Sequence, residues 1–149
     1  LSAEEADEIA GLAAARWDKA SARGLVVLEI GGVTGPLAGV LCGVYDVEMK
    51  RRAGHARDYR RRGFEDFGPW VFYAPNRRWY VSRTEARDAG AASGWIRSTP
   101  VPDGVQAFDV VHYFDHETLE IVEDARWEMY DEKMGEWVVD EKVTVSARR

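Results

Sequence analysis

The segment WVFYAPNRRWYVS, residues 70–82, contains two short runs of aromatic and β-branched residues separated by a Pro-Asn turn. Runs of this kind predict two strands joined as a hairpin. The segment WEMYDEKMGEWVV, residues 127–139, repeats the pattern W-x-x-Y, a turn region, and W-x-V. These two hairpins are therefore the expected folding anchors of a β-rich domain.

The tryptophans of these hairpins have two possible uses. Side chains three apart on a strand point to opposite faces, so Trp and Tyr of W-x-x-Y cannot share a face without a bulge. We expect instead that Trp70 meets Trp79, and Trp127 meets Trp137, across their hairpins, and that these rings are buried in the core. The alternative is an exposed aromatic platform for sugars, bases or methylated lysine, which would use members of this set and Trp95.

Beyond the hairpins, short apolar or alternating runs separated by Gly, Pro, Asn and Asp favour strands over helices from Leu25 onward. The alanine-rich run at residues 85–89, before Gly90, can form a single helical turn. We therefore predict a single, mainly β domain over residues 25–149, a compact antiparallel sandwich or barrel-like fold. The predicted strands cover residues 25–30, 39–49, 56–59, 70–73, 79–82, 95–97, 108–114, 118–122, 127–130, 137–139 and 143–146.

An amphipathic helix is predicted for residues 1–24. Ser2 and Glu5 have the spacing of a capping box, and Gly24 is placed to end the helix. Ile9, Leu12, Ala13, Arg16 or Trp17, and Ala20 recur at helical spacing and form a narrow apolar stripe, whose large members are Ile9, Leu12 and Trp17. This stripe either packs on the domain itself or docks into a partner protein, and we list it as a partner-binding candidate.

Composition excludes several classes of protein. The chain has 149 residues, of which 46% are apolar and 31% charged, so it suits one soluble globular domain rather than a disordered or collagen-like chain. The single cysteine, Cys42, excludes an internal disulfide and a four-thiolate metal site, and we expect it to be a small buried residue in a strand. Charges or glycines interrupt every apolar run before the roughly 18 residues that a spanning helix needs.

Charge is segregated along the chain, whose formal net charge is −6. Residues 115–141 contain eleven acids against two basic residues. A basic segment covers residues 50–62. We interpret it as a docking surface for protein, with a merely solvated face as the alternative. The overall acidity and the lack of a nucleic-acid-binding signature argue against nucleic acid as the partner. The basic residues are Lys50, Arg51, Arg52, Arg57, Arg60, Arg61 and Arg62.

Catalytic and metal-binding patterns are weak in this sequence. His112 and His116 are the best metal-ligand pair by residue type, but on a strand this spacing separates them by about 13 Å, too far for one ion. Ser82, Ser93, Ser98 and Cys42 lie in no nucleophile motif, and the chain has no P-loop or dinucleotide-binding pattern. We therefore predict no catalytic residue, metal or cofactor, and a metal-dependent hydrolase at the histidine pair is the least favoured function.

Several of these patterns together resemble a small Trp-rich β module that recurs in proteins of algae and other protists. The resemblance spans roughly residues 25–146, and it implies no catalytic or binding residue. The acidic stretch at 115–124 and the charged N-terminal helix depart from the usual pattern. The matching residues are Gly43-Val44-Tyr45, 54–59, 70–73, 78–82, Gly94-Trp95, 137–140 and 143–146.

These features lead to an expected function. A β body, an amphipathic helix and opposed charges predict a non-catalytic interaction or scaffold module, an accessory subunit of a larger protein assembly with at most peripheral membrane contact. The alternative is a carbohydrate- or small-ligand-binding module that uses exposed tryptophans. The chain begins with Leu1 rather than Met, which fits either a fragment or a processed protein. With the algal resemblance, processing would favour a plastid location, and the cytoplasm is the alternative.

Overall fold

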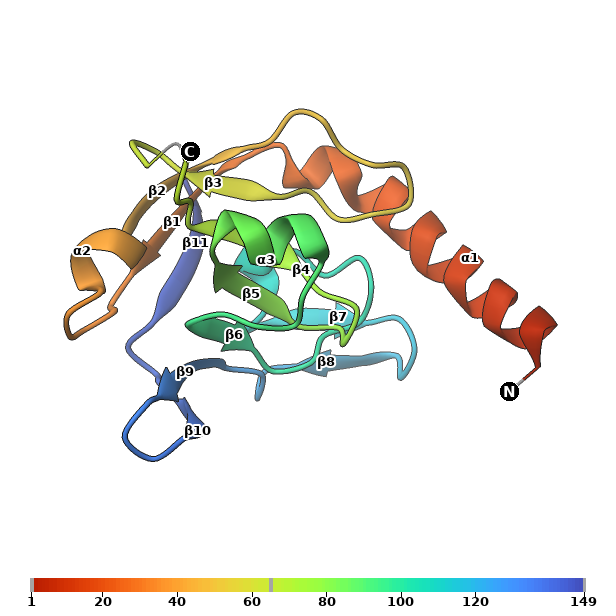
Figure 1. Cartoon of the computed structure of the whole chain (residues 1–149). Helices are drawn as coiled ribbons and strands as arrows, with labels where there is room; N and C mark the ends of the chain where they lie inside the picture. The colour runs from red at the N-terminus through yellow and green to blue at the C-terminus, as the bar shows by residue number, and fades with distance from the viewer. Residues whose placement is uncertain (1, 65, 149) are drawn as a thin grey trace.

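The computed structural model describes residues 2–64 and 66–148, which form a mainly β protein with an N-terminal helix (Figure 1). Leu1, Glu65 and Arg149, which belong to the segments predicted above, lie outside the described residues. The helices are α1 (Ala3–Ala20), α2 (Ala38–Leu41) and α3 (Thr84–Ala89), with 3-10 turns η1 (Ser21–Gly24) and η2 (Ala107–Asp109). The strands are β1 (Val27–Gly31), β2 (Gly43–Val47), β3 (Tyr59–Arg61), β4 (Trp70–Tyr73), β5 (Trp79–Ser82), β6 (Ile96–Ser98), β7 (Tyr113–Asp115), β8 (Glu120–Val122), β9 (Trp127–Asp131), β10 (Glu136–Val139) and β11 (Thr144–Arg148).

Nine of the strands form one antiparallel sheet that curls into a half-barrel. Their order is β10-β9-β6-β5-β4-β3-β2-β1-β11, so β10 and β11 are the two edges of this sheet. Strands β7 and β8 pair separately as a two-stranded hairpin. The predicted mainly β fold with an N-terminal helix is confirmed.

Two of the predicted strands are shorter than expected because each begins with a helical turn. Residues 39–49 were expected to be one strand, but α2 occupies Ala38–Leu41 and places Leu41 fully in the core, so β2 starts only at Gly43. Cys42 therefore ends a helical turn and is half-buried, which corrects its predicted place in a strand. In the predicted strand 108–114, η2 and the following turn bury Val110, and β7 starts at Tyr113.

The main core lies on one face of the half-barrel sheet. Trp79, Tyr45 and Tyr59 are its largest fully buried side chains. Their polar atoms are satisfied inside the protein, because the Tyr59 hydroxyl donates to the Gly24 carbonyl at 2.7 Å and the Trp79 Nε1 donates to the Val105 carbonyl at 2.9 Å. A smaller cluster on the other face of β4 and β5 contains Trp70, Phe72, Ala74 and Tyr80, with Ala86 of α3 and Trp137 packed against it.

The two hairpins pair differently from the prediction. Trp79 lies opposite Tyr73, with ring centroids 5.5 Å apart, and Trp137 lies opposite Tyr130 at 5.4 Å. Trp70 instead pairs with Ser82 and belongs to the smaller cluster. The expected Trp–Trp pairing is therefore wrong, because the hairpin register places the Tyr of the first strand opposite the Trp of the second. That Trp and Tyr of W-x-x-Y point to opposite faces is confirmed.

Candidate functional site

The first half of α1 extends away from the half-barrel (Figure 1). It begins as predicted, since the Ser2 hydroxyl accepts a hydrogen bond from the Glu5 amide at 3.1 Å. Ile9 and Leu12 are 57% and 59% exposed. No helix of the described part of the chain has the length and apolar character to span a membrane, α1 included. This half of the helix therefore presents two large apolar side chains to solvent.

Trp17 is the residue that attaches α1 to the body. It is only 3% exposed, and its ring meets Tyr73 and Trp79 edge to face at centroid distances of 4.8 and 5.8 Å. Its Nε1 donates to Asp103 at 3.3 Å. Trp17 is thus a core residue, and the predicted partner-binding stripe is corrected to Ile9 and Leu12 alone.

The exposed residues continue along one side of the helix. At 3.6 residues per turn, Ile9, Leu12, Arg16 and Lys19 fall within an arc of about 80° around the helix, whereas Trp17 lies about 140° from Leu12. This side is acidic in its first turns, apolar in the middle and basic toward the end. We call it the outer face of α1, and its members are Glu5, Glu8, Ile9, Leu12, Arg16 and Lys19.

A groove of about 870 Å³ lies between the second half of α1 and the β7–β8 hairpin. We call it the helix–hairpin groove. Phe114 and Ile121, which oppose each other across the hairpin, line it and are 46% and 62% exposed. Arg16, Lys19 and Arg23 line its helical side. The groove therefore combines an exposed apolar pair with a basic rim.

Ion pairs connect this rim to the rest of the protein. The guanidinium of Arg23 contacts both carboxylate oxygens of Asp109, at 2.6 and 2.7 Å. Arg16 contacts Glu117, in the turn between β7 and β8, at 3.2 Å. These pairs are partly exposed and contribute modestly to stability. The first connects η1 to η2, and the second connects α1 to the β7–β8 hairpin.

The predicted basic patch does not form one surface, because several of its members bind within the protein. Arg57 donates to the Ser21 carbonyl at 2.7 Å, and Arg61 donates to the Val40 carbonyl at 3.2 Å. Arg62 forms an ion pair with Asp46 at 2.6 Å. Arg60 points to the opposite face of β3, where its guanidinium lies 5.2 Å from the centre of the Trp70 ring.

The other three basic residues lie beside α1. Arg51 contacts Asp18 at 2.9 Å, and Asp18 also accepts from the Gly54 amide at 2.7 Å. These two donors hold the pKa of Asp18 below its usual value. Arg52 contacts the His55 ring at 2.8 Å, and Lys50 is exposed. Arg51 and Gly54 therefore attach the 50–56 loop to Asp18 of α1.

The histidine pair is separated by β7. His112 precedes the strand and lies 3.4 Å from Glu123, whereas His116 follows it and packs its ring against Phe114 at 5.0 Å. Within residues 2–64 and 66–148, no three His, Cys, Asp or Glu side chains are grouped to hold a metal ion.

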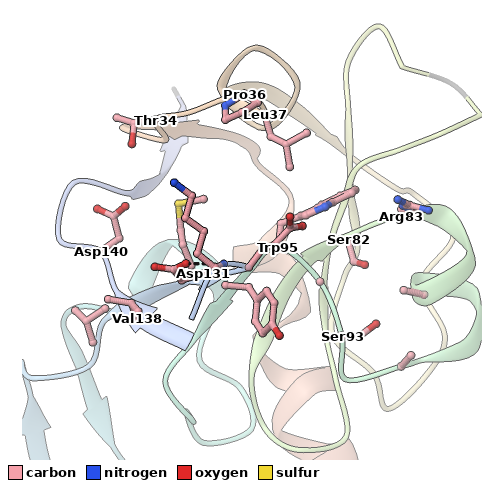
Figure 2. Close-up of a pocket in the computed structure, with 18 of the residues that line it drawn as sticks. Thr34, Pro36, Leu37, Ser82, Arg83, Ser93, Trp95, Asp131, Val138 and Asp140 are labelled. Atoms are coloured by element: carbon pink, nitrogen blue, oxygen red, sulfur yellow. Dashed lines mark hydrogen bonds between the residues drawn. The ribbon is translucent and has the colours of Figure 1, made fainter. Parts of the chain in front are cut away.

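A second groove, of about 1250 Å³, is formed by the 34–37 loop, the connection between α3 and β6, and the β9–β10 hairpin. Figure 2 shows Trp95 in its middle, between Leu37 on one side and Val138 and Asp140 on the other. Trp95 is half-buried, and the guanidinium of Arg83 lies 5.7 Å from its ring centre. This Trp95 groove offers a ring for stacking and carboxylates for hydrogen bonds.

The sequence did not indicate either groove. Both are built from segments far apart in the chain, and the exposure of Phe114 and Ile121 depends on which side of the β7–β8 hairpin packs on the core.

Comparisons with protein families, curated proteins and solved structures find no match to this chain. The resemblance to the Trp-rich β module therefore stays a prediction, and the function has to be argued from the surfaces described above.

Proposed function

We propose that this protein is a non-catalytic interaction module, an accessory subunit that joins a larger protein assembly through the outer face of α1. The observation that carries the proposal is the exposure of Ile9 and Leu12 on a helix that Trp17 anchors to the body. Burying two such side chains in a partner would contribute about 1.5–3 kcal/mol each. An amphipathic helix that lays its apolar side against a partner is a common mode of recognition.

The exposure of the first turns of α1 also supports an interaction role. Residues 3–12 are all exposed, so the helix there has only its cap and its own backbone hydrogen bonds for support. Helices without tertiary packing are marginal in water. A bound partner would supply the missing packing, which supports an interaction role for this segment.

The kind of partner and the cellular location stay as proposed from the sequence. We propose protein subunits as the partners, with membrane contact at most peripheral and a plastid as the compartment. The internal ion pairs of Arg51 and Arg62, and the hydrogen bonds of Arg57 and Arg61 to backbone carbonyls, favour α1 over the basic segment as the main contact.

Gel filtration of extract from the source cell tests the proposal. The wild-type protein should elute with a larger assembly, and a variant with Ile9→Ser and Leu12→Ser should elute at a smaller size. The matched control is Met134→Ser, because Met134 is 67% exposed in the turn between β9 and β10, far from α1 (Figure 1). Elution of the wild-type protein as a free single chain would overturn the proposal.

A second candidate function is the binding of a small ligand or carbohydrate in the Trp95 groove. It is favoured by one observation, that a half-buried tryptophan lines a groove of about 1250 Å³. Titration with soluble oligosaccharides, followed by tryptophan emission, should give a saturable change that Trp95→Ala abolishes and Trp137→Ala retains. The absence of any change across the sugars would reject this candidate.

A further inference from the structure

We propose that the partner of the outer face of α1 is the same face of a second copy, so that two α1 helices pack antiparallel about Leu12. This inference rests on the proposed function and names the partner. Its basis is the order of side chains along the outer face, which is acidic, then apolar, then basic.

The charges on this face are placed symmetrically about Leu12. Glu8 and Arg16 are each four residues from Leu12, and Glu5 and Lys19 are each seven residues away, in opposite directions. When two such helices run antiparallel with Leu12 at the centre, Glu8 of one copy faces Arg16 of the other and Glu5 faces Lys19. A parallel arrangement would place like charges together. Exposed ion pairs contribute little energy each, so their role here is to select the antiparallel direction.

The apolar residues occupy the centre of the same arrangement. Leu12 meets its own counterpart, and Ile9 lies one turn away on the same side of the helix. Ala15, which is exposed and small, flanks Leu12 and allows the two helices to approach closely. In a closed two-fold dimer, the same surface of each copy forms the contact, so a residue on the axis meets its own counterpart and all other contacts occur twice. The arrangement about Leu12 has this symmetry.

The helix–hairpin groove extends this contact beyond the helices. In the antiparallel pair, the first turns of the second copy's helix run along Arg16 and Lys19, which line the helical side of the groove. Its acidic residues then meet Lys19 and Arg16, the second of which also contacts Glu117 of its own chain. Its apolar side lies beside Phe114 and Ile121, whose exposure in the single chain is thereby explained. The second copy therefore accounts for both exposed apolar surfaces at once.

Position 12 provides a direct test, because in this dimer it faces itself. Purified wild-type protein should have the mass of two chains by light scattering. Leu12→Glu and Leu12→Lys should each have the mass of one chain, since each would place two like charges at the centre. An equal mixture of these two variants should return to the mass of two chains. Met134→Ser should remain a dimer.

A cysteine variant gives an independent measurement. In a Cys42→Ser background, Leu12→Cys should form a covalent dimer on mild oxidation, and Asp7→Cys, on another side of the helix, should not. A wild-type protein with the mass of one chain at all concentrations would overturn the second copy as partner. If the assembly in extract still required Ile9 and Leu12, the proposed function would stand and its partner would be another protein. If neither association were found, both proposals would fail.

Discussion

Trp17 of α1 meets Trp79 of β5 edge to face, with ring centroids 5.8 Å apart. Both rings are buried, and Tyr73 packs against each of them. This contact determines where α1 leaves the half-barrel, and hence which side of the helix faces solvent. Trp17 thus anchors the helix, and Ile9 and Leu12 on another side of it stay exposed.

Replacement of Trp17 by Ala should therefore weaken the fold itself. We expect a loss of about 3–5 kcal/mol in the free energy of unfolding, because a buried aromatic ring is removed from the core. Ile9→Ala, on the exposed side, should change stability by less than about 0.5 kcal/mol at concentrations where the protein is a monomer. Urea unfolding followed by circular dichroism measures both. Equal effects of the two variants would contradict the anchor role of Trp17.

Gly32 should not tolerate a side chain. Its φ is +78°, and a Cβ atom there would lie 1.6 Å from the Lys142 carbonyl oxygen, which belongs to the segment before β11. Gly32→Ala should cost about 3 kcal/mol or more, because both the backbone conformation and the close approach of two backbone segments are disturbed. Gly39→Ala is the control, since nothing lies within 4 Å of a Cβ there. Thermal unfolding should show a large decrease for the first variant only; similar melting temperatures would contradict this prediction.

Arg87 should stabilise the protein in a pH-dependent way. Its guanidinium contacts Asp58 at 2.8 Å and lies 4.2 Å from the centre of the Trp70 ring. Burial raises the pKa of Asp58 above its usual value, and Arg87 opposes that rise. Arg87→Ala should cost about 1–2 kcal/mol at neutral pH, because it leaves a carboxylate without its partner.

The sign of the pH effect follows from the protonation of Asp58. Without Arg87, the pKa of Asp58 in the folded protein rises further, while its pKa in the unfolded chain is unchanged. The cost of the substitution is therefore largest above this pKa and decreases as the pH falls through it, because protonated Asp58 needs no cation. Urea unfolding at a series of pH values measures this difference. Arg62→Ala, at the more exposed pair with Asp46, should cost much less. A cost for Arg87→Ala that does not vary with pH would contradict the pairing.

The six tryptophans should divide into two classes by solvent access. Trp17, Trp70, Trp79 and Trp127 are buried, and only Trp95 and Trp137 are half-buried. Replacing both half-buried residues by Phe should leave emission that acrylamide quenches much less than in the wild-type protein. Quenching that is unchanged in this double variant would show that solvent reaches the buried class.

The strands could be predicted because their signals are local. Alternating apolar residues and Gly- or Pro-containing turns predicted a strand that overlaps each observed strand. Ser2 and Gly24 marked the limits of the helical N-terminal segment. The exceptions are α2 and η2, whose helical turns place Leu41 and Ala107 in the core. Local propensity does not contain that information.

The candidate site was less predictable because it depends on which surfaces the fold leaves uncovered. Ile9 and Leu12 were identified from helical spacing, but the same spacing wrongly grouped them with Trp17. The basic segment looked like one patch in the sequence, yet β3 sends Arg60 and Arg61 to opposite faces. Phe114 and Ile121 are exposed through the packing of β7 and β8 on the core, which no local pattern specifies.

Site-specific photo-crosslinking in the source cell tests the binding role of α1 most directly. A photoreactive amino acid at position 12 should yield a covalent adduct with a protein, and the same group at position 134 should yield none, because only the first lies on the outer face of α1. An adduct with the mass of two chains would identify a second copy as the partner. If position 12 yields no adduct, or only those that position 134 also yields, then the outer face of α1 is not a docking surface.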